Sequence, residues 1–186
     1  MTPPFDEVPR LVLAGAESTG KTTLARTLAE HFGVPWVAEY GREYTEQKYR
    51  DGMLTDAWEP EEFLLIAREQ VRREDAAAST GPPFVVADTD AFVTRLWYER
   101  YLGAPPSAAD WPHDHGRERI YLVPEPDVAF VADAIRDGEQ FRRWMHERTL
   151  ADLAALGREV HLLRGDYAAR TGDAIAFVNE RFRLKR

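Results

Sequence analysis

The chain has 186 residues, of which 44% are hydrophobic and 30% charged, a balance typical of a folded globular domain rather than a disordered chain. The formal net charge of −8 argues against a surface that wraps nucleic acid, and the absence of cysteine excludes disulfides, thiolate metal sites and cysteine nucleophiles. No apolar run approaches the roughly 18 residues that a membrane span requires, so we expect a soluble cytoplasmic protein with neither nucleic acid nor a membrane as partner.

Short apolar runs alternate with longer stretches of helical periodicity along the chain. In chain order, the pattern predicts a strand at 10–14, a helix ending at Gly33, a strand at 34–38, a helix at 61–78, a strand at 84–87, a helix at 92–101, a polar loop at 103–116, a strand at 119–123, a helix at 139–156, a strand at 159–163, and a last helix with Ile175, Val178 and Phe182. Such alternation needs crossover connections, which favour a parallel sheet covered on both faces. We therefore predict one three-layer α/β domain over residues 1–186, with a mostly parallel five-stranded sheet.

The segment after the first strand, Gly-Ala-Glu-Ser-Thr-Gly-Lys-Thr, matches the phosphate-binding pattern G-x-x-x-x-G-K-[ST] in its required strand-to-helix context. In such a P-loop the backbone N–H groups and the helix N-terminus face the anion, the lysine neutralises the β- and γ-phosphates, and the threonine hydroxyl reaches Mg²⁺. ATP and Mg²⁺ are the expected cofactors, held by Gly15, Glu17, Ser18, Thr19, Gly20, Lys21, Thr22 and Thr23.

Three acidic residues follow predicted strands, at the sheet edge where α/β proteins bind ligands. Asp88 is expected to hold Mg²⁺ together with Thr22 and to face the substrate. Glu39 ends the second strand and is our preferred group for accepting the proton of an acceptor hydroxyl. Asp90 is the alternative base or a ribose ligand, and it could equally cap the helix that follows it.

Aromatic and basic residues surround the acid at the end of the second strand. We expect Tyr40 and Tyr44 to contact the acceptor and Trp36 to pack beneath the helices. Arg42 either pairs with Glu39 or Asp88 or binds an acceptor phosphate, as a nucleoside-monophosphate kinase would require. A compact P-loop domain with acceptor groups on its second strand is expected to be a kinase acting on a small molecule.

A lid over the phosphates is expected at about residues 133–146, where Arg136, Arg142 and Arg143 cluster. Arg136 is the candidate that contacts the nucleotide and neutralises transition-state charge, since a mobile lid arginine also excludes water. Arg170 follows the fifth strand, where P-loop kinases often contact adenine, and is a further candidate for nucleotide binding. An ordinary strand-to-helix connection capped by Asp166 is the competing interpretation.

Three motifs in register, the P-loop, Glu39-Tyr-Gly-Arg-Glu43 and Asp88-Thr-Asp90, resemble the ribosylnicotinamide kinase domain of NadR-type NAD-salvage proteins, over about residues 10–183. The family's D-G-x-R segment before the lid helix reads Asp133-Ala-Ile-Arg136 here, with alanine in place of glycine. The resemblance implies a P-loop kinase fold and transfer of the ATP γ-phosphate to the ribose 5′-hydroxyl of nicotinamide riboside, giving nicotinamide mononucleotide. Members are often fused to an adenylyltransferase domain, and this chain resembles the kinase half alone.

The pyridinium charge of that acceptor suits an aromatic and acidic pocket around Tyr40 and Tyr44. Two rival interpretations stay open. One is a kinase for another nucleoside, a thiamine-like cation or a nucleoside monophosphate, and the other is a non-catalytic ATP-sensing module that binds a protein partner. The sensing module is disfavoured by the joint presence of Lys21, Thr22, Asp88 and Glu39.

Overall fold

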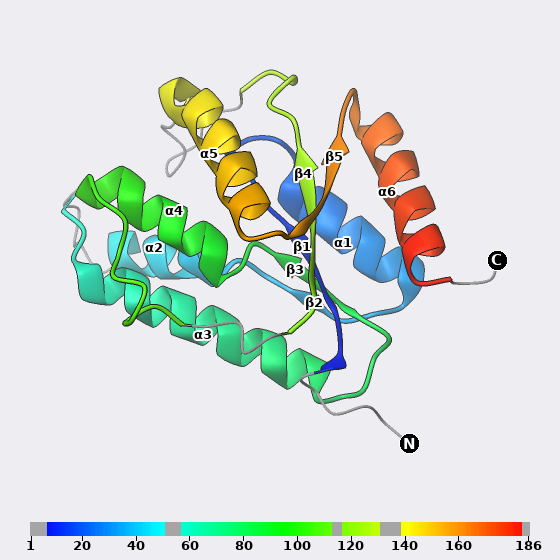
Figure 1. Ribbon diagram of the computed structural model, residues 1–186, viewed down its shortest axis with the longest axis horizontal. Coiled ribbons are helices and arrows are strands. Elements are labelled where there is room, and N and C mark those ends of the chain that lie inside the picture. Colours follow the sequence, from blue (N-terminus) through cyan, green and yellow to red (C-terminus); the bar gives the residue numbers. More distant parts are fainter. Residues whose placement is uncertain (1–6, 51–56, 113–116, 131–138, 184–186) are drawn as a thin grey trace.

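The computed structural model describes residues 7–50, 57–112, 117–130 and 139–183. At its centre is a five-stranded sheet in the order β2-β3-β1-β4-β5, and each adjacent pair of strands is parallel (Figure 1). The strands are β1 (Arg10–Leu13), β2 (Trp36–Val37), β3 (Val85–Asp88), β4 (Arg119–Pro124) and β5 (Glu159–Leu163). The predicted parallel α/β sheet is confirmed, with every strand where its apolar run predicts it.

The helices are α1 (Lys21–Phe32), α2 (Tyr40–Arg50), α3 (Pro60–Ala78), α4 (Ala91–Leu102), the short 3₁₀ helix η2 (Glu139–Phe141), α5 (Arg142–Ala155) and α6 (Tyr167–Arg181). Because side chains alternate across a strand, β1 sends Leu11 and Leu13 to one face and Val12 to the other. The first face packs on α1 and α6, and the second packs on α4 and α5 (Figure 1). The result is the predicted three-layer arrangement.

The structure explains how two of the predicted helices begin or end. Gly33 ends α1 with a φ of 64°, and its N–H bonds back to the last turn, as a left-handed C-cap does. The predicted helix at 139–156 begins with the 3₁₀ turn η2 before it becomes α5. Trp36 is partly buried against the core beneath α1, as expected, with the Arg26 guanidinium 4.4 Å from its ring centroid.

Helix α2 is missing from the predicted elements. Its sequence, YGREYTEQKYR, is polar on nearly every side, and its only buried residue is Lys48. A helix without an apolar stripe gives no periodic hydrophobic signal, so sequence periodicity could not detect it. It lies beside α3, and a Cβ at Gly41 would come within 3.5 Å of Ile66 on that helix.

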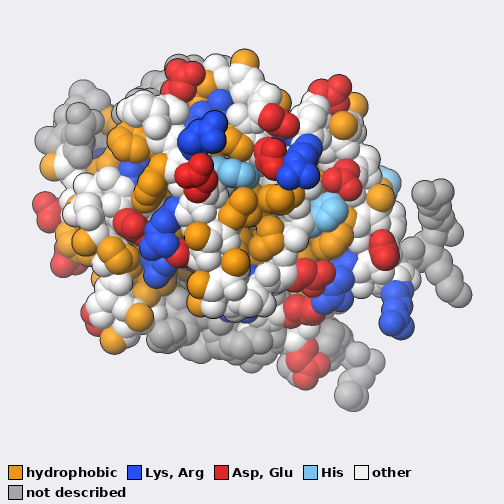
Figure 2. Space-filling model, turned by 45° about the horizontal axis from the view of Figure 1, so that its top comes forward, with side chains coloured by type: hydrophobic (Ala, Val, Ile, Leu, Met, Phe, Trp, Pro, Cys, Tyr) orange, Lys and Arg blue, Asp and Glu red, His pale blue; other side chains and the backbone are white. Residues whose placement is uncertain are grey.

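Two of the predicted segments, the lid and the polar loop, are described only in part. Residues 133–138 of the predicted lid, including Arg136, and residues 113–116 of the predicted loop lie outside the described residues. The rest of that loop, 103–112, contains neither helix nor strand. Across the described ranges, each helix is too short or too polar to cross a membrane. On the face shown in Figure 2, basic and acidic side chains are interspersed.

Candidate active site

The P-loop connects β1 to α1 through a backbone that turns left-handed three times. The φ angle is 115° at Gly15, 54° at Ser18 and 83° at Gly20. A Cβ at Gly15 would meet the side chain of Val123 on β4 at 3.4 Å, an ordinary contact, so it is the positive φ that favours glycine there. The sequence pattern therefore has the local geometry that a phosphate cradle needs.

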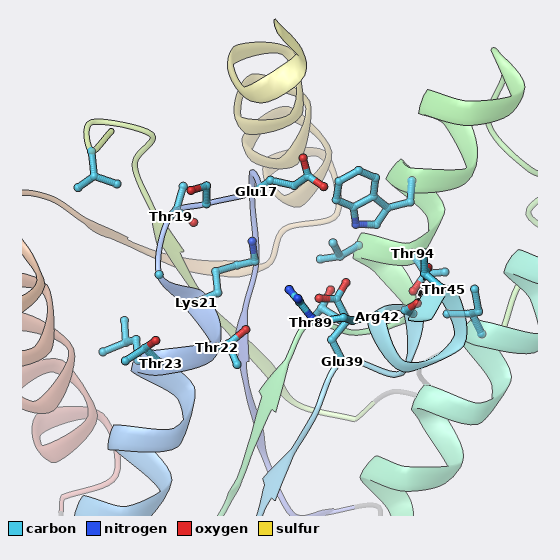
Figure 3. Close-up of a pocket in the computed structure, with 18 of the residues that line it drawn as sticks. Glu17, Thr19, Lys21, Thr22, Thr23, Glu39, Arg42, Thr45, Thr89 and Thr94 are labelled. Atoms are coloured by element: carbon cyan, nitrogen blue, oxygen red, sulfur yellow. Dashed lines mark hydrogen bonds between the residues drawn. The ribbon is translucent and has the colours of Figure 1, made fainter. Parts of the chain in front are cut away.

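A cavity of about 490 Å³ opens beside the P-loop, and residues from five helices reach it (Figure 3). One end is lined by the P-loop from Glu17 to Thr23, together with Val128, Ala129, Tyr167 and Arg170. The other end is lined by polar groups and rings from the β2–α2 junction, α3 and α4. The dimensions and the two chemically different ends suit two substrates bound side by side.

Lys21 and Thr22 face the cavity from the start of α1, and Glu39 faces it from the end of β2 (Figure 3). The Lys21 ammonium donates a hydrogen bond of 2.6 Å to the Ala16 carbonyl inside the loop. The Thr19 hydroxyl donates to the same carbonyl at 3.0 Å. The lysine is therefore already folded over the loop, where its charge would meet a phosphate.

Glu39 has an unusual ionisation. Withdrawal from water is the largest cause and the nearby charge of Asp88 the second, and together they raise the pKa of Glu39 to about 7 from an ordinary value near 4.5. Lys21 and Arg42 act in the opposite direction. A carboxyl of this kind is half protonated near neutral pH, which is the range where a general base works best.

Asp88 is the last residue of β3 and is 2% exposed. It stands in register with Leu13, the last residue of β1, so it lies at the sheet edge from which the P-loop departs. Its influence on the pKa of Glu39 shows that the two carboxylates are near each other. Lys21, Thr22, Glu39 and Asp88 thus lie at one edge of the sheet, and the first three of them line the cavity whereas Asp88 does not.

Asp90 lies apart from this group. It is 1% exposed and does not line the cavity. One carboxylate oxygen accepts the Val93 N–H at 3.0 Å as the N-cap of α4, and the other accepts the Tyr121 hydroxyl at 2.8 Å and a 3.2 Å bond from Arg119. The cap interpretation is therefore confirmed, and the geometry favours Glu39 over Asp90 as the carboxylate that meets the acceptor.

We expect Asp90→Ala to reduce the free energy of unfolding by about 3 to 5 kcal/mol, because it removes a cap and leaves the buried charge of Arg119 with one partner fewer. Urea unfolding followed by circular dichroism measures this. Asp166→Ala is the matched control, since Asp166 caps α6 through Ala169 but is exposed, and its loss should cost about 1 kcal/mol. Equal losses for the two variants would contradict the buried-network role.

The structure corrects the predicted placement of Tyr40 and Tyr44, because neither lines the cavity. The Arg73 guanidinium covers the Tyr40 ring at 4.4 Å, and the Tyr44 hydroxyl donates to Glu62 at 3.0 Å. Burial and that carboxylate raise the pKa of Tyr44 to about 12. Since helix α2 begins at Tyr40, both rings turn toward α3 instead of following the strand direction into the site.

Other aromatic residues line the acceptor end: Tyr49, Trp58, Phe63, Trp97 and Tyr101. The ring centroids of Trp58 and Tyr101 are 5.5 Å apart, and those of Trp58 and Phe63 are 5.0 Å apart. Thr45 and Thr94 add hydroxyls to the same end. Trp97 and Tyr101 are four residues apart and share one face of α4. This spacing is the sequence signal that could have identified them as lining residues.

The arginines have different positions. Arg42 lines the cavity, and its Nε donates at 2.9 Å to Glu46, a carboxylate that the prediction did not name. Arg170 is 3% exposed, donates to the Thr19 carbonyl at 2.7 Å and pairs with Asp127, so it supports the P-loop while lining the cavity. Asp166 caps α6, as the competing interpretation predicted.

Of the predicted lid arginines, only Arg142 and Arg143 fall within the described residues. Arg142 donates to the Val128 carbonyl at 3.1 Å and to the Ser18 carbonyl at 3.4 Å, so it reaches the P-loop. The Arg143 side chain is 89% exposed and pairs with Glu147 at 3.7 Å. Within the same described ranges, no group of three or more His, Asp or Glu residues could hold a metal ion by itself.

A family model described as an AAA domain matches residues 10–170. The chain belongs to this AAA_28 family. The match runs from β1 to the start of α6 and includes every residue that lines the cavity.

Curated relatives and solved structures connect this AAA_28 domain to NadR and confirm the resemblance inferred from the motifs. It is 25% identical over 173 residues to the "Trifunctional NAD biosynthesis/regulator protein NadR" of Salmonella typhimurium, covering 91% of this chain and 42% of that protein. The NadR of Escherichia coli is 26% identical over 126 residues, covering 68% of this chain and 30% of that protein. The chain thus spans less than half of the curated relatives it matches.

A crystal structure of NadR protein in complex with NR superposes with a TM-score of 0.76 at 28% identity, covering 96% of this chain and 52% of that chain. A NadR structure with NAD and AMP-PNP gives a TM-score of 0.75 at 26% identity, covering 96% and 51%. A thymidylate kinase from Ehrlichia chaffeensis matches with a TM-score of 0.55 at 11% identity, covering 94% and 99%, which shows the P-loop kinase fold alone.

Proposed function

We propose that this chain is an ATP-dependent kinase that phosphorylates the ribose 5′-hydroxyl of nicotinamide riboside to give nicotinamide mononucleotide. The observation that carries the proposal is one cavity with a P-loop at one end and a carboxylate among aromatic rings at the other. The similar NadR structures, solved with NR and with AMP-PNP, support the same pair of ligands.

The nucleotide end fits a triphosphate. The left-handed turns at Ser18 and Gly20 and the N-terminus of α1 offer backbone N–H groups to an anion, and Lys21 would neutralise the β- and γ-phosphates. Thr22 and Asp88 are the hard oxygen ligands that Mg²⁺ prefers, and the ion usually takes only one or two protein groups beside phosphate. When bound, Mg²⁺ supplies charge neutralisation on the phosphates.

The acceptor end fits a cationic aromatic nucleoside. Trp58, Trp97 and Tyr101 offer the π-faces that attract a pyridinium ring, and Glu39 adds negative charge when ionised. Across the cavity from the P-loop, Glu39 would accept the hydroxyl proton as the acceptor oxygen attacks the γ-phosphorus. Phosphoryl transfer has a loose transition state, so holding the two substrates in line and neutralising their charge is most of the task.

The test is a coupled assay of ADP release with a panel of acceptors: nicotinamide riboside, common nucleosides, thiamine and nucleoside monophosphates. We expect turnover with nicotinamide riboside and detection of nicotinamide mononucleotide by mass spectrometry. Turnover with a different acceptor, and none with nicotinamide riboside, would show that the proposed substrate is wrong. ATP binding without acceleration by any acceptor would favour an ATP-sensing module.

We expect Trp97→Ala to raise the KM for nicotinamide riboside by about 10- to 30-fold, because a desolvated cation–π contact contributes about 2 kcal/mol. The KM for ATP should change less, because the cation–π contact is made with the acceptor, although Trp97 packs against a cluster that includes Ala16 of the P-loop. Initial rates with each substrate varied in turn separate the two constants. A parallel rise in both would show general damage to the cavity.

A further inference from the structure

Lys48 is a buried lysine on α2 that the proposed chemistry does not use. It is 8% exposed and does not line the cavity. Its ammonium donates at 2.9 Å to the Ala57 carbonyl and at 2.9 Å to each carboxylate oxygen of Glu62. The three donors of the ammonium therefore all have oxygen partners, which is the arrangement that allows a charge to be buried.

The same ammonium lies 4.3 Å from the ring centroid of Trp58, within cation–π distance. Trp58 lines the acceptor end of the cavity and contacts the rings of Phe63 and Tyr101. Lys48 thus contacts one face of the Trp58 indole, the side chain that the acceptor would contact in the cavity. The contact depends on a cation that is itself fixed by three hydrogen bonds, so the plane of the indole is fixed with it.

Glu62 is the anchor of this cluster. Its carboxylate also accepts the Tyr44 hydroxyl at 3.0 Å and the Glu59 N–H at 2.8 Å, which closes a capping box at the start of α3. Four hydrogen bonds on one carboxylate leave it little freedom. Burial acts to raise the pKa of Glu62, but the hydrogen bonds from Lys48, the Glu59 N–H and Tyr44 outweigh burial and hold the pKa below its ordinary value. The ammonium therefore has a fixed counter-charge, which limits its repulsion of a cationic ring on the far side of the indole.

The choice of lysine fits this geometry. The chain has only three lysines among its 24 basic residues, so arginine is the default base here. A planar guanidinium presents its donors in a fixed fork, whereas an ammonium is a compact charge whose three donors diverge. Here the ammonium directs its donors to a carbonyl and to both oxygens of a carboxylate while it lies over the indole.

We propose that Lys48 is a positioning residue for the acceptor: held by Glu62 and Ala57, it fixes the indole of Trp58 as a wall for a cationic aromatic ring. This inference rests on the proposed function, since it takes nicotinamide riboside as the ring. It assigns to Lys48 a role in acceptor affinity, although Lys48 itself does not line the cavity.

The experiment compares wild type, Lys48→Met, Lys48→Arg and Tyr44→Phe for turnover, for the melting temperature, and for the Kd of nicotinamide riboside by calorimetry. We expect Lys48→Met to raise the KM and the Kd about tenfold, with kcat and the KM for ATP within about twofold. Lys48→Arg keeps a cation that can lie over the indole, so it should recover part of the affinity that Lys48→Met loses. Tyr44→Phe is the matched control, because it removes a donor to Glu62 and leaves the ammonium on the indole.

The outcomes separate the two proposals. If Lys48→Met and Tyr44→Phe lose melting temperature alike and neither changes the KM or Kd, Lys48 is purely structural and the inference is overturned while the proposed function stands. If wild type binds nicotinamide riboside without turnover, the proposed function fails, and the Kd values of the variants still decide the role of Lys48. If wild type does not bind it, both proposals fall.

Discussion

Replacing Glu39 by glutamine is expected to lower kcat by about 10²- to 10⁴-fold while ATP still binds. The amide keeps the size and hydrogen-bonding reach of the carboxylate but cannot accept the proton of the acceptor hydroxyl. Glu39 lines the cavity opposite the P-loop, whereas the N–H groups and cations that would hold the nucleotide belong to other residues. Steady-state rates give kcat, and calorimetry with a non-hydrolysable ATP analogue gives the nucleotide Kd.

The same residue predicts the pH dependence of activity. Because the pKa of Glu39 is raised to about 7, the fraction of carboxylate that can act as base falls about tenfold per pH unit below that value. We therefore expect kcat/KM for the acceptor to fall with unit slope on the acid side. Glu17 contributes to raising this pKa, so Glu17→Gln should move the inflection to lower pH. An inflection that Glu17→Gln leaves in place would assign it to another group.

Stability should change in the opposite direction from activity. A carboxyl whose pKa is higher in the folded state than the ordinary 4.5 binds a proton on folding, so stability is lost as pH rises from about 4.5 through about 7. Glutamine does not ionise, and Glu39→Gln should therefore melt higher than wild type at pH 8 and show a smaller difference at pH 5. If Glu39→Gln keeps near wild-type turnover and Asp90→Asn is folded but inactive, the two acids have exchanged roles.

The sequence was sufficient to predict the features that depend on short segments. A short apolar run such as Leu11 to Leu13 predicts a buried strand, and the spacing of the P-loop motif predicts the positive φ angles of its glycines. Residues that end neighbouring parallel strands must share an edge, so Glu39 and Asp88 could be expected together. For these groups, local pattern and topology leave few alternatives.

Side-chain direction around α2 could not be predicted in the same way. Whether Tyr40 and Tyr44 face the cavity depends on α2, a helix that lacks an apolar stripe. If these residues are not recognised as helical, both rings are assigned the wrong direction. The partners that fix them, Arg73 and Glu62, lie on α3. Aromatic residues near an acid in sequence therefore indicated the right kind of surface but on the wrong element.

Asp90 illustrates a second limit, that of long-range charge pairing. Its partners Arg119 and Tyr121 are on β4, and Arg119 also meets Glu74 of α3 at 2.8 Å. The chain pattern shows only an acid two residues after another acid, which is equally compatible with a cap and a ligand. Burial of the whole network is what distinguishes the two, and burial follows from the tertiary fold.

Lys21→Met is expected to reduce kcat by about 10³-fold or more and to weaken ATP binding. In the structure the ammonium is held by the Ala16 carbonyl at 2.6 Å, a bond that it can exchange for phosphate oxygens without moving far. Methionine fills the same space without the charge. Arg143→Met is the matched control, because it removes an exposed cation and should leave kcat within about twofold.

The same substitution should act on Glu39 as well, since the charge of Lys21 lowers the pKa of that carboxyl. Removing the lysine raises the pKa further, so the acid limb of the residual activity should move to higher pH. In the double variant Lys21→Met with Glu39→Gln, kcat should fall little below that of Lys21→Met alone, because both groups act on one transfer. Fully multiplicative losses, or an acid limb that stays in place, would mean that the two ends of the cavity work independently.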